Sequence, residues 1–129
     1  MIIVGFKVVH YSRVKAENVE IEGFKGVTVR WLITKDDGAE NFAMRYFEIK
    51  PGGKTAFHSH DWEHEVFVLS GKGRVRCGNE EKMVEAGYVV FIPSNVPHCF
   101  ENLGEDTLRF LCLIPVSYTH LTLPTNREV

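Results

Sequence analysis

The sequence of 129 residues has no long hydrophobic run, no cluster of basic residues and few cysteines. Its apolar runs reach about six to eight residues, against the roughly 20 needed to span a bilayer, so no transmembrane helix is expected. Fifteen Lys+Arg against 17 Asp+Glu give a net charge of −2. This balance provides no positive patch for nucleic acid or for an anionic membrane, and neither is expected as a partner.

Secretion and disulfide signals are also absent. The first residues, from Met1 on, lack the basic, apolar and small-residue regions of a signal peptide. Cys77, Cys99 and Cys112 are odd in number and widely spaced, which indicates free buried thiols in a reducing compartment more than a disulfide framework. We therefore expect a cytoplasmic protein.

Short segments rich in β-branched and aromatic residues alternate with turn formers such as Pro51-Gly52-Gly53. No apolar pattern keeps a helical period beyond about three turns, so helices are expected to be short at most. Strands at this spacing predict one all-β domain, an antiparallel sandwich or barrel. The expected strands are Phe6–Val9, Val27–Ile33, Phe42–Ile49, Glu65–Leu69, Arg74–Cys77, Tyr88–Ile92 and Leu108–Ile114.

The last residues depart from this pattern. From Val116 the chain reads Val-Ser-Tyr-Thr-His-Leu-Thr-Leu-Pro-Thr, which resembles the translation of a transposon-end sequencing adapter. We interpret residues 1–115 as the single domain and residues 116–129 as a non-biological tail. The alternative is a genuine polar strand or tail, because residues 118–123 have fair β-propensity.

Four of the six histidines fall in two segments. His58, His60 and His64 lie in His-Ser-His-Asp-Trp-Glu-His, and His98 ends Pro-Ser-Asn-Val-Pro-His. In an extended segment His58 and His60 point to the same face, and a curled sheet can bring His64 and His98 onto it. Imidazole is a common metal ligand, and clustered buried histidines without a metal are costly. These four residues are therefore the predicted metal ligands, while the lone His10 is expected at the surface.

The spacing of these residues resembles the two signature motifs of the cupin superfamily. The matching patterns are Gly52-x5-His58-x-His60-x3-His64-x6-Gly71 and Gly87-x5-Pro93-x-Asn95-x2-His98-x3-Asn102. The resemblance implies an all-β double-stranded β-helix, the cupin jelly-roll barrel. The family usually has glutamate where His64 stands and glycine where Asn95 stands. Only His64 keeps both spacings, and Glu65 would face the opposite side of a strand, which favours a four-histidine site.

The wider sequence from about Val27 to Pro115 looks like one subgroup, the small single-domain cupins with four histidines. Some of these bind manganese and show oxidative cleavage chemistry. The resemblance implies one divalent transition metal per chain, manganese or iron, and a homodimer. Ligand softness by itself would also admit zinc, nickel or copper at an all-imidazole site.

Strand parity suggests the substrate pocket. Phe110, Cys112 and Ile114 share one face of their strand, and by resemblance to the subgroup this face lines the cavity beside the metal. Arg45 stands in an apolar strand, where it would bind a substrate carboxylate or enolate, or form a salt bridge. Arg45 and Cys112 are the candidate catalytic residues, with a plain buried thiol as the alternative for Cys112.

Three functions are compatible with such a site. The leading one is an oxidoreductase of dioxygenase type that brings dioxygen and a small, partly apolar organic substrate to the metal. A metal-dependent isomerase or lyase of sugar-like substrates would use the ion only to polarise a carbonyl. A non-enzymatic cupin that binds a small ligand is the third, because the same barrel serves many functions.

Overall fold

The structure, a computed structural model, describes residues 5–118, and most of them lie in strands. The strands are β1 (Glu17–Asn18), β2 (Lys25–Ile33), β3 (Phe42–Lys54), β4 (His64–Ser70), β5 (Lys72–Cys77), β6 (Glu80–Glu85), β7 (Val89–Ile92), β8 (His98–Asn102) and β9 (Leu108–Pro115). The helices among the described residues are three 3-10 turns: η1 (Tyr11–Arg13), η2 (Lys35–Asp37) and η3 (Val116–Tyr118). None of these is long and apolar enough to cross a membrane.

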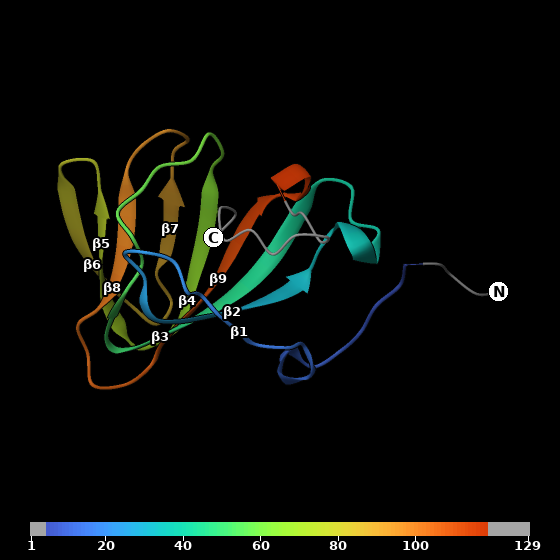
Figure 1. The fold of residues 1–129 in the computed structure, drawn as a ribbon, viewed down its shortest axis with the longest axis horizontal. Helices are drawn as coiled ribbons and strands as arrows, with labels where there is room; N and C mark the ends of the chain where they lie inside the picture. Colours follow the sequence, from blue (N-terminus) through green and yellow to red (C-terminus); the bar gives the residue numbers. More distant parts are fainter. Residues whose placement is uncertain (1–4, 119–129) are drawn as a thin grey trace.

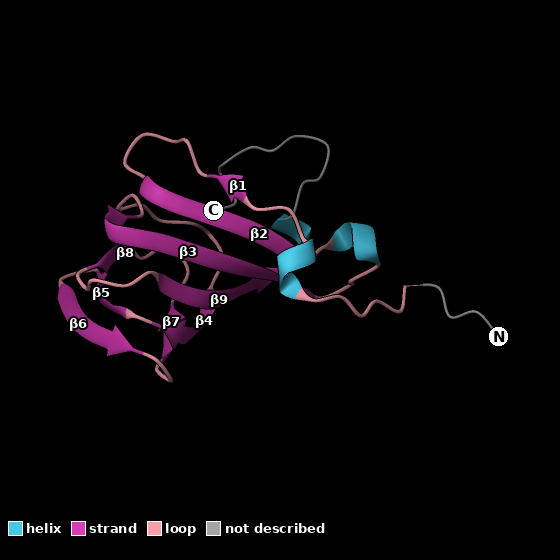
Figure 2. Cartoon of the chain, turned by 90° about the horizontal axis from the view of Figure 1, so that it is seen from below, coloured by secondary structure: helices cyan, strands magenta, loops and turns pink. Residues whose placement is uncertain are grey.

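All strand pairings are antiparallel, and they join into one sheet with the order β6-β5-β8-β3-β9-β4-β7. The strand β2 pairs with β3 on its other side, and β1 pairs with β2. The sheet curls on itself: β5, β6 and β8 lie at one end, β2 and β9 at the other, and the long strand β3 pairs with both groups (Figure 1), as the view from below also shows (Figure 2). The predicted all-β jelly-roll barrel is confirmed.

The core forms where the inner faces of this curled sheet meet. Along β9, buried and half-buried residues alternate strictly, and Phe110 is on the buried face. Its ring stacks on Phe47 from β3 at 5.3 Å and on Phe100 from β8 at 4.8 Å between centroids. The period of two in the sequence thus becomes one apolar face, because successive side chains of a strand point to opposite sides.

Most predicted strands are present, but one is wrong and three were missed. Residues 6–9 are irregular, and Phe6 and Val8 are largely exposed, because this segment has no partner strand among the described residues. The strands β1, β6 and β8 were not predicted. The sequence of β6, Glu80–Glu85, is mostly charged, and only Val84 in it is buried, so it lacks the apolar alternation.

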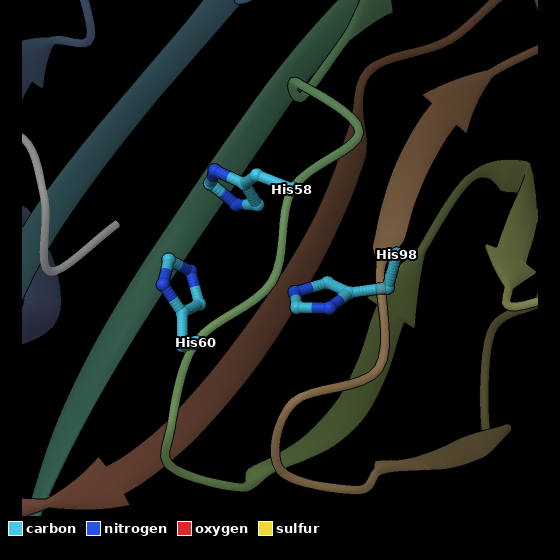
Figure 3. Close-up of side chains that lie close together, drawn as sticks. All are labelled: His58, His60 and His98. Atoms are coloured by element: carbon cyan, nitrogen blue, oxygen red, sulfur yellow. The ribbon is translucent and has the colours of Figure 1, made fainter.

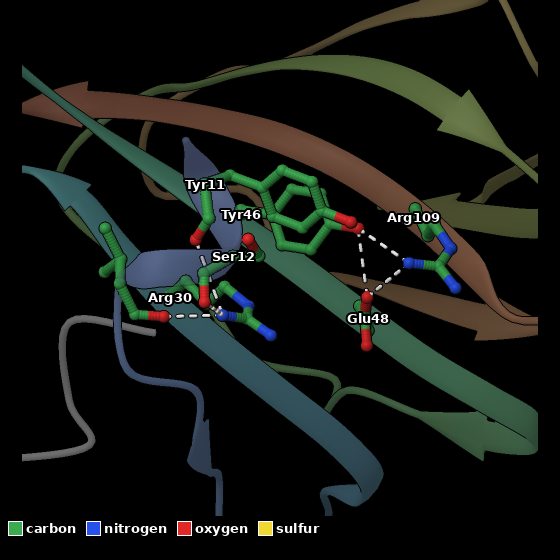
Figure 4. A network of polar contacts seen from close by, with 7 residues as sticks. Tyr11, Ser12, Arg30, Tyr46, Glu48 and Arg109 are labelled. Carbon is green, nitrogen blue, oxygen red and sulfur yellow. Dashed lines mark hydrogen bonds and ion pairs between the residues drawn. The ribbon is translucent and has the colours of Figure 1, made fainter. Parts of the chain in front are cut away.

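The N-terminal turn is fixed to the outer face of the barrel by backbone carbonyls. The Arg30 guanidinium donates to the carbonyl oxygens of Tyr11 and Ser12 at 3.4 and 3.2 Å and to that of Val14 (Figure 4). The Tyr11 ring lies 4.8 Å from the Tyr46 ring, whose hydroxyl joins Glu48 and Arg109. These contacts are on the far side of β3 from the histidines.

The predicted boundary after Pro115 falls between β9 and η3. Val116 is buried against the core, and its N–H donates to the Asn41 carbonyl at 3.0 Å. The rest of the predicted tail, residues 119–129, lies outside the described residues. All three cysteines are free.

Candidate metal centre

His58 and His98 are brought together by the backbone. The two residues form an isolated antiparallel bridge in which each N–H donates to the other's carbonyl, at 3.1 and 2.9 Å. Residues directly opposed in such a pair place their side chains on the same face. This bridge explains how histidines 40 residues apart in the sequence come to share one site.

The turn before β8 helps to hold His60 in place. The backbone N–H of Asn95 donates to the His60 carbonyl. Asn95 has φ 65°, and it is the one non-glycine residue with a positive φ among the described residues. The cupin motif has glycine at this point, and asparagine is among the residues that best tolerate the left-handed conformation. The departure from the motif is therefore compatible with the same backbone.

Three of the four predicted ligands form one cluster. Nitrogen atoms of His58, His60 and His98 all lie within 4.8 Å of one another, and their rings converge from two segments of the chain (Figure 3). His64 is outside this group of three, but its ring centroid is 4.8 Å from that of His98 and 5.2 Å from that of His60. His64 starts β4 and is buried, whereas Glu65 is exposed on the other face, as predicted.

The cluster favours neutral imidazoles. Burial lowers the pKa of His58 to about 4, with further lowering from the charges of His98 and Arg45. Burial also lowers the pKa of His64 and of His98, and the Arg45 charge acts in the same direction on both. A metal ion binds the neutral form of histidine, so these rings are in the state that ligation requires.

The hydrogen bonds also leave a nitrogen available for a ligand. His98 Nδ1 lies 2.9 Å from the Val96 carbonyl, to which it donates, so Nε2 has a free lone pair. His64 Nε2 is buried and has no hydrogen-bond partner among the described residues. A buried polar atom without a partner is costly, and a divalent ion would satisfy it. The residues present therefore fit a metal.

The other face of His64 touches two polar groups from neighbouring strands. Arg45 Nη2 lies 3.1 Å from His64 Nδ1 and 2.9 Å from Cys112 Sγ. The distance between His64 Nδ1 and Cys112 Sγ is 3.2 Å. Arg45 is fully buried, and its guanidinium lies over the Trp31 and Phe47 rings. Burial raises the pKa of the Cys112 thiol, although Arg45 opposes this. Both candidate catalytic residues thus lie directly behind a predicted ligand.

A small cavity of about 20 Å³ lies between the histidines and the core. Arg45, Phe110 and Cys112, three of the four residues expected at the substrate pocket, line it. Ile114 does not line the cavity but packs into the hydrophobic core. It lies two residues beyond Cys112 on β9, which is about 7 Å further along the strand. The cavity-lining residues that were missed are Phe24, Phe47, Thr55 and Phe100. The parity of Phe47 with Arg45 was a usable signal, whereas nothing in the sequence pointed to Phe24.

Comparison with known proteins supports the fold and the family. The polyketide cyclase RemF from Streptomyces resistomycificus superimposes with a TM-score of 0.81 and 40% identity, over 86% of this chain and 80% of that one. The 1-methylthio-D-xylulose 5-phosphate methylsulfurylase of Rhodospirillum rubrum is 31% identical over 106 residues, which are 82% of this chain and 67% of that protein. The oxalate-binding protein of Thermotoga maritima is 31% identical, over 83% of this chain and 92% of its own length.

The matched part of the chain spans 67% to 92% of the length of these relatives. A family model described as a cupin domain matches residues 45–114. This range contains all four of the histidines described above, and the match covers more than half of the chain. The chain belongs to the cupin domain family.

Proposed function

We propose that this cupin is a metal-dependent enzyme that closes or rearranges a ring in a small, partly apolar carbonyl compound of the polyketide type. The observation that carries the proposal is the convergence of His58, His60 and His98 within 4.8 Å, beside the buried unpartnered Nε2 of His64. The similarity to a polyketide cyclase, at 40% identity, supports this reaction class.

The four histidines would hold one divalent transition metal. Manganese or iron follows from the sequence resemblance, and imidazole ligands also suit zinc, nickel and copper. Such an ion supplies Lewis-acid polarisation of an oxygen-bearing group, or electron transfer if it is redox-active. Arg45 fixes His64 from behind, and the apolar side chains of Phe47, Phe100 and Phe110 keep water away from the ligands.

Oxidation of the dioxygenase type is the second candidate. The small cavity favours it, because about 20 Å³ beside the histidines has room for one water-sized molecule, and dioxygen is of that order. Phe24, Phe47 and Phe110 give this space an apolar lining, which suits an apolar gas better than a sugar. Cys112 stays a candidate catalytic residue in both reactions.

The first experiment is metal analysis of the purified protein and of two variants. His58→Ala and His98→Ala should each reduce the bound metal. His10→Ala should not, because the His10 side chain is exposed and hydrogen-bonds only with Ser12 among the described residues. Unchanged metal content in both site variants would exclude the metal centre.

The second experiment is a turnover assay with aromatic β-diketone substrates in air and under argon. Conversion at equal rates in both atmospheres is expected for ring closure or rearrangement, which needs no oxidant. Conversion only in air, with oxygen consumed, would show that the reaction is of the dioxygenase type and not the proposed ring closure or rearrangement. Binding without conversion in either atmosphere would identify a non-enzymatic binding protein and overturn the proposal.

A further inference from the structure

The cavity next to the histidines is too small for an organic substrate. Its volume of about 20 Å³ is enough for a single ion or water molecule, whereas small-molecule sites usually measure about 300–1,000 Å³. A substrate must therefore approach the histidines from outside the barrel, where a second and larger space is present.

An open hollow of about 600 Å³ lies between residues 20–24 and residues 56–62. Phe24 and His58 line both this hollow and the inner cavity, and His60 also lines the hollow. A molecule in the hollow is thus in contact with two of the predicted metal ligands. The volume is in the range of small-molecule sites.

Aromatic rings form the part of the hollow nearest to the histidines. Trp62 stacks flat on His60, with 4.2 Å between ring centroids and 8° between planes. The Phe24 ring meets His58 edge-on at 5.5 Å. Ile21 and Ala56 add apolar surface beside these rings. Such a wall suits a flat ring, since offset-stacked and edge-to-face contacts each contribute about 0.5–1.5 kcal/mol beyond simple burial.

The charged residues of the hollow are all acidic. Glu20, Glu22 and Asp61 line it and are exposed, and no Lys or Arg is among its lining residues in the part of the chain that the structure describes. A divalent ion at the histidines and the Arg45 guanidinium behind them would attract anions, but neither positive charge is among the residues that line the hollow itself. The charges that line the hollow are three carboxylates, which disfavour a phosphate or carboxylate group on a ligand bound there.

We propose that this hollow is the substrate subsite and that it selects flat, uncharged ring compounds over anionic compounds of the same shape. The inference rests on the proposed function, because it takes the histidine cluster as the reaction centre. A preference for uncharged ligands would distinguish this chain from the relatives that are named for a sugar phosphate and for oxalate, both of which are anionic.

The test compares two probes with the same flat ring system, 2-naphthol and 2-naphthyl phosphate, by calorimetric titration of the metal-loaded protein. The wild-type protein should bind 2-naphthol more tightly, by about tenfold or more. The triple variant Glu20→Gln, Glu22→Gln, Asp61→Asn should reduce that preference to less than about threefold, mainly by tighter binding of the phosphate. Trp62→Ala should weaken 2-naphthol binding, and Trp62→Phe should restore part of it.

The matched control is Glu85→Gln, Glu105→Gln, Asp106→Asn, which removes three carboxylates from a different surface hollow and should leave the preference unchanged. Equal or tighter binding of the phosphate to the wild-type protein would overturn the proposal, as would an unchanged preference in the Glu20→Gln, Glu22→Gln, Asp61→Asn variant. Metal content and thermal unfolding, measured on every variant, show that the site is intact. Failure of the proposed function would instead appear as absent turnover by the metal-loaded protein, with the probe preference retained.

Discussion

Arg45 Nη2 lies 3.1 Å from His64 Nδ1, although the two residues are on different strands of the barrel. The same nitrogen lies 2.9 Å from Cys112 Sγ, so one guanidinium connects β3, β4 and β9 behind the histidine cluster. A guanidinium is always a donor and has a rigid planar shape, which defines the positions of the groups that it contacts. For Nε2 of His64 to bind a metal, Nδ1 must carry the proton, which it can donate to Cys112 Sγ, and the same sulfur accepts from Arg45. Arg45 therefore acts as a positioning residue for His64 through Cys112.

Replacement of Arg45 by lysine should weaken metal binding by about 10- to 100-fold, as loss of an outer partner of a ligating histidine typically does. The ammonium of lysine cannot reproduce the planar guanidinium that lies over the Trp31 and Phe47 rings and brings one nitrogen close to both His64 and Cys112. Chelator competition measures the affinity. Cys112→Ser should have a smaller effect, because the hydroxyl still accepts from Arg45.

Arg30→Lys is the matched control for this prediction. Arg30 anchors the N-terminal turn through backbone carbonyls and does not contact the histidines. Its replacement should leave the metal affinity unchanged. Wild-type affinity in Arg45→Lys would show that Arg45 does not position His64.

The sequence predicted much of the site, because fixed spacing places His58, His60, His64 and His98 in two short motifs. The backbone bridge between His58 and His98 turns this spacing into proximity. The contact of Arg45 with His64 could not be predicted, since it depends on which strands become neighbours. The size of the inner cavity and the role of Phe24 were equally inaccessible, because they depend on how a loop packs across the barrel opening.

The fold was predictable where strands are apolar on one face. The segment of β9 shows this, since Phe110 and Cys112 alternate with half-buried leucines. The charged strand Glu80–Glu85 could not be predicted from apolar alternation, because its pairing with β5 is made by the backbone and needs little apolar surface. Residues 6–9 have β-propensity, but propensity does not supply a neighbouring strand.

Gly71, in the turn between β4 and β5, should not tolerate a side chain. Its φ is +88°, and an added Cβ would lie 2.6 Å from the Thr107 carbonyl oxygen and 2.8 Å from Leu108 Cα. Gly71→Ala should lower the free energy of unfolding by about 3 kcal/mol, from the left-handed backbone and the clash together. Denaturant unfolding measures this change.

Gly87→Ala separates these two contributions. Gly87 has a similar φ of +92°, but an added Cβ would meet no atom within 4 Å. Only the backbone penalty remains, and the expected loss is about 1–2 kcal/mol. Equal losses in both variants would mean that the turn at Gly71 adapts and that the close approach of Thr107 does not matter.

The η2 turn should lose stability in acid through Asp37. Partial burial raises the pKa of Asp37, but the bonds from the Thr34 backbone N–H and from Lys7 outweigh this, and the pKa is lower than its ordinary value. A carboxyl group whose pKa is lower in the folded state stabilises the fold above its unfolded pKa. That stabilisation is lost as the pH falls through the folded-state pKa.

Asp37→Asn should therefore cost about 0.5–1 kcal/mol at neutral pH and almost nothing once the wild-type carboxyl is protonated. Asp36→Asn removes the same charge from the same turn but not the bond to Thr34, and should cost less. Thermal unfolding between pH 2 and pH 7 gives both comparisons. A difference between wild type and Asp37→Asn that persists at the lowest pH would contradict the assignment.

Metal binding should stabilise the folded protein, because the four histidines converge only in the folded chain. A ligand at 100 times its dissociation constant adds about 2.7 kcal/mol, which corresponds to several degrees in Tm for a domain of this size. Addition of a divalent transition metal to the apoprotein should raise Tm by this order, and a chelator should reverse the shift. His98→Ala should abolish the response, since it removes the ring whose Nε2 is directed toward the cluster, while the backbone bridge to His58 is kept. His10→Ala should retain it. A metal-induced shift that is the same in both variants would place the binding site elsewhere on the protein.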